Sequence, residues 1–155
     1  MLEVTMSTSK VVTELLNGMV HSIRKVMPVH IEHSNPSVLT KPYEQEQIAV
    51  LIGMTGQLKG NILIDGEKQH FSSLGNTMYG MYLEDDMLIS FIGEIGNMIA
   101  GNLTTYISSE GVEMDITPPS VMSGSTTLHN YAQAIHLPFK AEGVGNFSIL
   151  VSIQQ

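Results

Sequence analysis

The amino-acid sequence predicts an α/β domain of the α+β kind, in which long helices pack on a largely antiparallel sheet. Residues 8–27 and 84–109 carry apolar side chains at helical spacing over several turns. Residues 47–54 and 58–65 are rich in β-branched and aliphatic residues, as strands are. The short, glycine-containing connection between these two strands favours an antiparallel hairpin. We therefore expect the long helices to cover a sheet built from such hairpins.

The first half of the chain continues this pattern. The helix over 8–27 is expected to end at Pro28, because the residue before a proline avoids helical geometry. A short extended piece, 29–32, follows it. After the hairpin, a second helix is predicted over 67–82. Its inward-facing residues are expected to be Phe71, Leu74, Met78 and Met81.

The second half begins with the helix over 84–109. Its first turn carries three carboxylates, which favour the positive end of the helix dipole. Strands are expected at 112–116, 131–138 and 144–153. The last of these alternates only loosely between apolar and polar residues, which is typical of a central strand.

The two halves share a pattern. Glu-x-x-Asn occurs at 14–17 and at 94–97, and each copy is followed by Pro-Ser-Val and then by a hairpin. We interpret this as an internal duplication within a single domain, residues 1–155, with pseudo-symmetric halves at about 8–82 and 84–155. Chance similarity between such short matches is the alternative.

Composition excludes several functional classes. Hydrophobic residues make up 43% of the 155 residues and charged residues only 14%, as in folded proteins. The formal charge is −8 and Lys and Arg do not cluster, so binding to nucleic acid or to an anionic membrane surface is not expected. No cysteine is present, which excludes thiol catalysis and disulfides. Without a transmembrane run or a signal-peptide pattern, the sequence predicts a soluble cytoplasmic protein.

A metal site is not expected. The spacing of His30 and His33 could suit a metal, but both residues precede a proline-containing loop. No third ligand stands at helical or hairpin spacing to them.

The helix over 84–109 carries an unusual polar stripe. Ser90, Glu94 and Asn97 stand at i, i+4 and i+7, so at about 100° per residue they lie within roughly 60° of one another. Gly101 falls on the same stripe, whereas Gly96 points towards the other side and is expected to pack on the sheet. Such a stripe is ordinarily just the solvated face. However, Asn is a poor helix former and each Gly costs about 1 kcal/mol relative to Ala, which favours a face shaped for a partner.

The segment around this stripe closely resembles the helix signature of the CheC/CheX/FliY family of chemotaxis phosphatases, and most of all its CheX-like members. In that signature an Asp or Ser is followed by Glu after four residues, by Asn after three more, and by Pro about twenty residues later. Ser90, Glu94, Asn97 and Pro119 occupy these positions. Segments 53–60 and 118–124 also resemble the family, so the similarity covers residues 10–153.

The resemblance implies a phosphatase that hydrolyses the aspartyl phosphate of a CheY-like response regulator. Asn97 would hold the attacking water in line with the phosphoryl group, because a carboxamide can accept one hydrogen bond and donate another. Glu94 would pair with the active-site Lys of the regulator. Ser90, Gly101 and Pro119 would contact the partner or shape the adjoining loop. The Mg²⁺ would belong to the regulator, and the phosphatase would need no cofactor of its own.

The echo at Glu14 and Asn17 raises a possible second site. Here Lys10 stands where the family signature has Asp or Ser. The alternative is a relic of duplication in which Asn17 and Gly18 lie at a packing contact.

Two other functions compete with catalysis. One is a non-catalytic module that binds response regulators or scaffold components, although it would have no need of both Glu94 and Asn97. The other is a plain α/β domain that uses the polar face to dimerise. The resemblance also implies a homodimer formed through the sheets, for which the sequence offers an exposed edge near 131–153.

Overall fold

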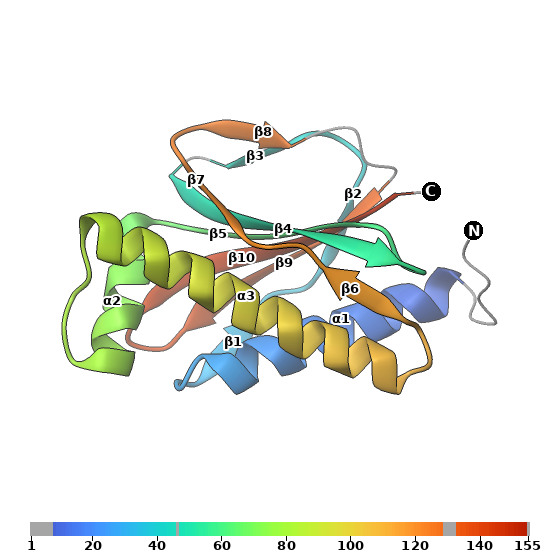
Figure 1. Cartoon of the computed structure of the whole chain (residues 1–155), viewed down its shortest axis with the longest axis horizontal. Coiled ribbons are helices and arrows are strands. Elements are labelled where there is room, and N and C mark those ends of the chain that lie inside the picture. The colour runs from blue at the N-terminus through green and yellow to red at the C-terminus, as the bar shows by residue number, and fades with distance from the viewer. Residues whose placement is uncertain (1–7, 46, 129–132, 155) are drawn as a thin grey trace.

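The computed structural model describes residues 8–45, 47–128 and 133–154, in which three helices cover one face of an eight-stranded sheet (Figure 1). The helices are α1 (Thr8–Val26), α2 (Lys68–Tyr79) and α3 (Asp85–Ser109). The strands of the large sheet are β1 (Ile31–His33), β2 (Ser37–Leu39), β4 (Ile48–Gly56), β5 (Gly60–Gly66), β6 (Met114–Ile116), β7 (Ser120–Ser123), β9 (Gln133–Ala141) and β10 (Gly145–Ile153). A small second sheet pairs β3 (Tyr43–Gln45) with β8 (Thr126–Leu128). The predicted α+β class is confirmed.

The strands of the two halves cross over to one another. The large sheet has the order β1-β9-β10-β5-β4-β6, with β2 also paired to β9 and β7 to β4. All of these pairs are antiparallel. The short strands β1 and β2 therefore extend the second hairpin, whereas β6 and β7 extend the first. Both halves follow the order helix, two short strands, one strand of the small sheet, and hairpin.

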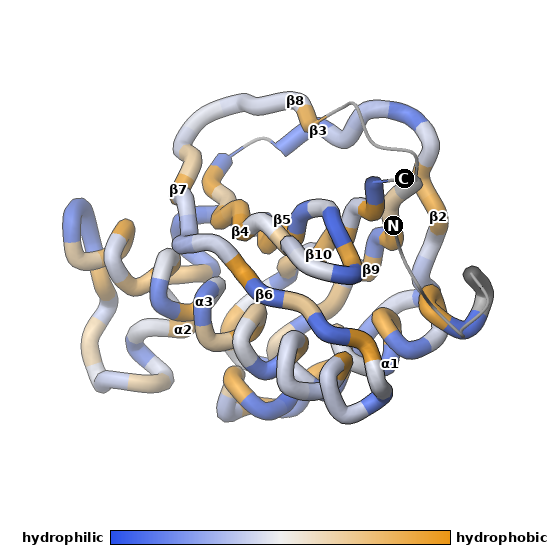
Figure 2. Tube along the Cα trace, turned by 45° about the vertical axis from the view of Figure 1, so that its right-hand side comes forward, coloured by the Kyte–Doolittle hydropathy of each residue, from blue (hydrophilic) through white to orange (hydrophobic). Residues whose placement is uncertain are grey.

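The main core lies between the helices and the sheet. Alternate residues of β4 face the helices, as the two-residue period of a strand requires. Figure 2 shows hydrophobic and hydrophilic residues following one another along α1. At the spacing of a helix, its hydrophobic residues form one buried face. The buried face of α3 consists of apolar side chains at the helical spacing that the sequence shows over 84–109. It is formed by Leu88, Phe91, Ile92, Ile95, Ile99 and Leu103.

The small sheet covers part of the opposite face. A second apolar cluster, Ala49, Leu63, Ala134 and Leu150, lies there and packs against residues of β3 and β8. The Tyr43 hydroxyl donates a hydrogen bond of 2.8 Å to the Asp65 carboxylate and so ties β3 to β5. None of the helices in the described ranges is long and apolar enough to cross a membrane.

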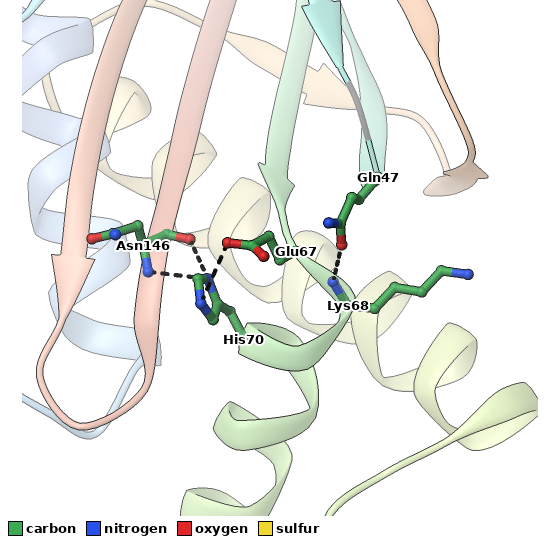
Figure 3. A network of polar contacts seen from close by, with 5 residues as sticks. All are labelled: Gln47, Glu67, Lys68, His70 and Asn146. Atoms are coloured by element: carbon green, nitrogen blue, oxygen red, sulfur yellow. Dashed lines mark hydrogen bonds and ion pairs between the residues drawn. The ribbon is translucent and has the colours of Figure 1, made fainter.

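The N-terminus of α2 is fixed to two strands (Figure 3). The Lys68 backbone N–H donates to the Gln47 side chain at 3.0 Å, and the His70 ring meets the backbone of Asn146 at the start of β10. His70 also lies 3.5 Å from Glu67. Gly145 is needed here, because its φ is 149° and a Cβ atom would lie only 2.3 Å from the His70 ring. These contacts set the position of α2, and with it the connection that leads into α3.

The helix α2 is shorter than predicted. It ends at Tyr79, because Gly80 adopts a left-handed φ of 79° and its N–H bonds to the Asn76 carbonyl at 2.8 Å. Phe71 and Leu74 are buried as predicted, and Met78 is partly buried. The expectation that Met81 faces inward is wrong, because it follows the helix end and is 50% exposed.

The exposed sheet edge predicted near 131–153 is also wrong. β10 lies between β9 and β5, which agrees with its interpretation as a central strand, and β9 is covered by β1 and β2. The short strands β1/β2 and β6/β7 form the edges instead. Residues 131 and 132, where that predicted edge begins, lie outside the described residues.

Candidate functional site

Four sequence-predicted residues meet at one depression of about 680 Å³ on the surface of α3. Ser90, Glu94 and Asn97 are exposed along one side of the helix, and Pro119 faces them from the connection between β6 and β7. The rest of the depression is lined by Gly93, Ile116, Thr117 and Pro118. The structure therefore brings together a hydroxyl, a carboxylate and a carboxamide beside a proline-lined wall. Gly101 lies on the same helix, outside the depression.

The proline-lined wall is held in place by β4. The Thr117 backbone N–H donates to the Gly53 carbonyl at 2.9 Å, and the Gly53 N–H donates to the Thr117 hydroxyl at 2.8 Å. Pro119 in turn lies against Gly93, where a Cβ atom would be 3.9 Å from the proline ring. Sequence reasoning missed Thr117 and Pro118. The Pro118-Pro119 doublet could have indicated Pro118. Nothing in the sequence indicates that Thr117 pairs with Gly53.

The polar side chains of the site are available to a partner. Further along α3, Asn102 donates its side-chain N–H to the Met98 carbonyl at 2.8 Å, and Thr104 and Thr105 also bond back to the helix backbone. Within the described ranges, no hydrogen bond or ion pair joins the side chain of Ser90, Glu94 or Asn97 to the protein. Asn97 therefore keeps both hydrogen-bonding functions of its amide free, and Glu94 keeps its carboxylate free.

A second feature beside the site was not predicted. An apolar groove of about 450 Å³ runs between the end of α2 and the first turns of α3. It shares Ser90 and Glu94 with the depression. Its apolar residues are Tyr79, Met81, Leu83, Met87 and Phe91. Sequence reasoning missed it because the helix was expected to continue through Met81.

The candidate second site on α1 has different surroundings. A hydrogen bond with Glu14, and then the charge of Glu14, raise the pKa of Glu110 at the end of α3, while the charge of Lys10 acts in the opposite direction. Burial, followed by the charges of Glu14 and Glu110, raises the pKa of Tyr106. Glu14 is thus engaged by α3, unlike Glu94, although Asn17 is exposed.

Gly18, next to Asn17, lies at a packing contact. A Cβ atom on Gly18 would be 2.7 Å from Leu103 on α3. This close approach of α1 to α3 agrees with the alternative that the α1 motif is retained for packing.

The described residues contain no group of three or more His, Asp or Glu placed to hold a metal ion. His30 lies 3.5 Å from Glu32, and both side chains are exposed.

The glycines of α3 lead to a paired prediction. A Cβ atom on Gly96 would lie 2.6 Å from Val50 on β4, whereas one on Gly101 would meet nothing within 4 Å. We expect Gly96→Ala to lower the free energy of unfolding by about 1–3 kcal/mol because of overpacking. Gly101→Ala should raise it by about 0.5–1 kcal/mol because alanine favours the helix. Urea denaturation of both variants checks this, and equal shifts would contradict the packing role of Gly96.

Sequence comparisons place these features in a family. The family model described as "Chemotaxis phosphatase CheX" matches residues 48–140, which is more than half of the chain. The chain is also similar to the CheY-P phosphatase CheX of Thermotoga maritima, with 26% identity over 150 residues that cover 94% of this chain and 97% of that protein.

Solved structures show the same fold. A CheC-like superfamily protein from Shewanella sp. PV-4 superposes with a TM-score of 0.79 at 24% identity, covering 97% of this chain and all of that one. A chain of the CheX-CheY-BeF3-Mg²⁺ complex from Borrelia burgdorferi gives 0.77 at 22% identity, covering 93% of this chain and 97% of that one. The family predicted from the stripe on α3 is thereby confirmed: this chain belongs to the CheX family of chemotaxis phosphatases.

Proposed function

We propose that this protein hydrolyses the aspartyl phosphate of a CheY-like receiver domain, with Asn97 and Glu94 as its principal residues. The observation that carries the proposal is the exposed pair that these side chains form one helical turn apart in the depression, with no hydrogen bond or ion pair to the described residues. The named activity of the Thermotoga maritima relative and the CheY-bound structure from Borrelia burgdorferi support the same partner chemistry.

The reaction requires little covalent chemistry from the phosphatase. A water molecule attacks the phosphorus atom, the bond between phosphorus and the aspartyl oxygen breaks, and inorganic phosphate leaves the regenerated carboxylate. Catalysis is then mainly a matter of positioning. The Asn97 carbonyl oxygen accepts a hydrogen bond from the attacking water, and its N–H donates to a phosphoryl oxygen.

Glu94 acts in docking. Its carboxylate pairs with the active-site lysine that receivers carry beside the phosphoryl group. This contact fixes the position at which Asn97 enters the receiver's site. Because the contact is shielded from water in the complex, it is worth more than an exposed ion pair. Ser90 contacts the receiver one turn earlier, Gly101 leaves room one turn later, and Pro119 shapes the wall of the depression.

The remaining properties stay predictions. The Mg²⁺ is assigned to the receiver, and the phosphatase is expected to need no cofactor of its own. A homodimer and a cytoplasmic location are likewise expected. Because β9 and β10 already have strand neighbours on both edges, a dimer that extends the sheet would have to use other strands.

The direct test follows the decay of a receiver labelled with radioactive phosphate, with and without this protein. We expect the protein to accelerate the release of inorganic phosphate at substoichiometric concentration. Binding of the receiver without any acceleration would favour the alternative, a non-catalytic module that binds response regulators.

The number of active sites is tested with Asn17→Ala. Because Glu14 contacts Glu110 and Gly18 packs on Leu103, we expect this variant to retain the full rate of dephosphorylation. The same decay assay measures it. A loss of about half of the rate would instead indicate a second working site on α1.

A further inference from the structure

We propose that the apolar groove beside the site receives an apolar side chain of the receiver domain and thereby contributes to the choice of receiver. This inference rests on the proposed function. The groove is the surface formed by Tyr79, Met81, Leu83, Met87 and Phe91, with Asp86, Ser90 and Glu94 at its margin.

Several large apolar side chains of the groove are exposed to solvent. Tyr79 is 57% exposed, Met81 50% and Met87 58%, and the neighbouring Tyr82 is 63% exposed. Single exposed apolar residues are ordinary, but a contiguous group of them marks an interaction surface. Methionine suits this use because its unbranched, polarizable side chain adapts to the shape of a partner.

The walls of the groove are preformed. Leu83 is buried and packs tightly on α2, where a Cβ atom on Gly75 would lie 2.7 Å from it. The Ser72 hydroxyl donates a 2.8 Å hydrogen bond to the Leu83 carbonyl. The rings of Tyr79 and Phe91 meet edge to face with centroids 5.8 Å apart. Leu83 and Phe91 are therefore already ordered before a partner binds, and only the exposed methionines have to adapt to it.

The start of α3 gives the groove an acidic margin. Asp85 has a φ of 53°, and it is the one non-glycine residue with positive φ in the described ranges. Such a conformation is costly for a side chain other than glycine and tends to persist at functional sites. Asp86 follows it at the margin of the groove, with Glu94 two turns further along. The fitting occupant is thus an aliphatic or aromatic side chain flanked by cationic groups.

Continuity with the depression identifies that occupant as the receiver. Ser90 and Glu94 line both the groove and the depression. A receiver whose lysine reaches Glu94 therefore lies directly beside the adjoining groove. A second copy of this chain bound there would cover Ser90 and Glu94, which the proposed function assigns to the receiver, and this makes it the less suitable occupant.

The test compares the double variant Met81→Ala/Met87→Ala with the control Val38→Ala. Val38 is 56% exposed on β2, away from the helices of the site. With a beryllofluoride-activated receiver, which is not hydrolysed, we expect the double variant to raise Kd by about tenfold. With the phosphorylated receiver it should raise KM by about tenfold and leave kcat within about twofold, as loss of uniform binding does. The control should leave all three unchanged.

A second measurement separates this inference from the proposed function. In protein labelled at the methionine methyl groups, addition of the activated receiver should shift the Met81 and Met87 signals and leave the buried Met19 and Met27 unchanged. Such shifts, together with a raised Kd in the double variant, support binding of the receiver in the groove even if the protein does not hydrolyse the phosphate. Unchanged Kd in the double variant, or methyl shifts that arise only from self-association of this chain, would overturn it.

Discussion

Asn97→Ala should reduce kcat for dephosphorylation of the receiver by about 100-fold or more. The carboxamide is proposed to hold the attacking water and to stabilise the phosphoryl group at the same time. Removing one such preorganised hydrogen-bonding group typically lowers kcat by roughly 10²–10³-fold. The side chain is exposed and makes no bond within the described structure, so its removal should leave the free energy of unfolding almost unchanged.

The effect is measured with the labelled receiver at saturating concentration, so that kcat is separated from binding. Asn102→Ala is the matched control, because Asn102 lies on the same helix but donates its side-chain N–H to Met98. It should retain full activity. Asn97→Asp adds a sharper comparison, since a carboxylate of the same shape accepts from water but cannot donate to a phosphoryl oxygen. Full activity in Asn97→Ala would remove the water-positioning role.

Glu94→Gln should raise the Kd for the activated receiver by roughly 30-fold, which corresponds to about 2 kcal/mol. Glutamine keeps the length of the side chain and removes the charge that pairs with the receiver's lysine. The loss exceeds that of an exposed ion pair because the lysine is left without a partner in a shielded contact. Titration by fluorescence anisotropy measures Kd at two ionic strengths. The salt dependence of binding should be weaker in the variant.

Glu113→Gln controls for the general effect of charge. It changes the net charge of −8 in the same way, but it lies beyond the C-terminal end of α3 and is exposed. Binding should stay close to wild type. Equal effects of the two substitutions would indicate long-range attraction and would remove the specific role of Glu94.

The sequence was most informative where elements are long. The apolar stripe of α3 repeats over many turns, so both the helix and its buried face could be predicted. The strands β2, β3, β7 and β8 were missed, because three or four residues are too few to show a period of two. Their pairing depends on distant partners, such as Val38 with Ile135. The same limitation led to the wrong edge near 131–153.

The site likewise has residues that the sequence predicts and residues that only the tertiary structure brings in. Ser90, Glu94 and Asn97 share one helix, so their spacing alone places them on one face. Thr117 is held by Gly53, far away in the chain, and no local pattern indicates that contact. The groove depends on the single residue Gly80, whose left-handed backbone ends α2 early and leaves Met81 on the surface. A glycine near a helix end has this effect only when the tertiary structure favours it.

The exchange of short strands between the two hairpins has a consequence for how the chain reaches this structure. Ile31 on β1 pairs with Ala141 on β9, and Val50 on β4 pairs with Val121 on β7. Both sheet edges can therefore form only after most of the polypeptide is available, and the entropy of closing these long loops is lost before the pairs form. Such high contact order predicts slow folding, in the range of milliseconds to seconds. During synthesis, β4 should lack its outer partners until β6 and β7 have been made, and at that stage its exposed edge is the part of the protein most vulnerable to aggregation.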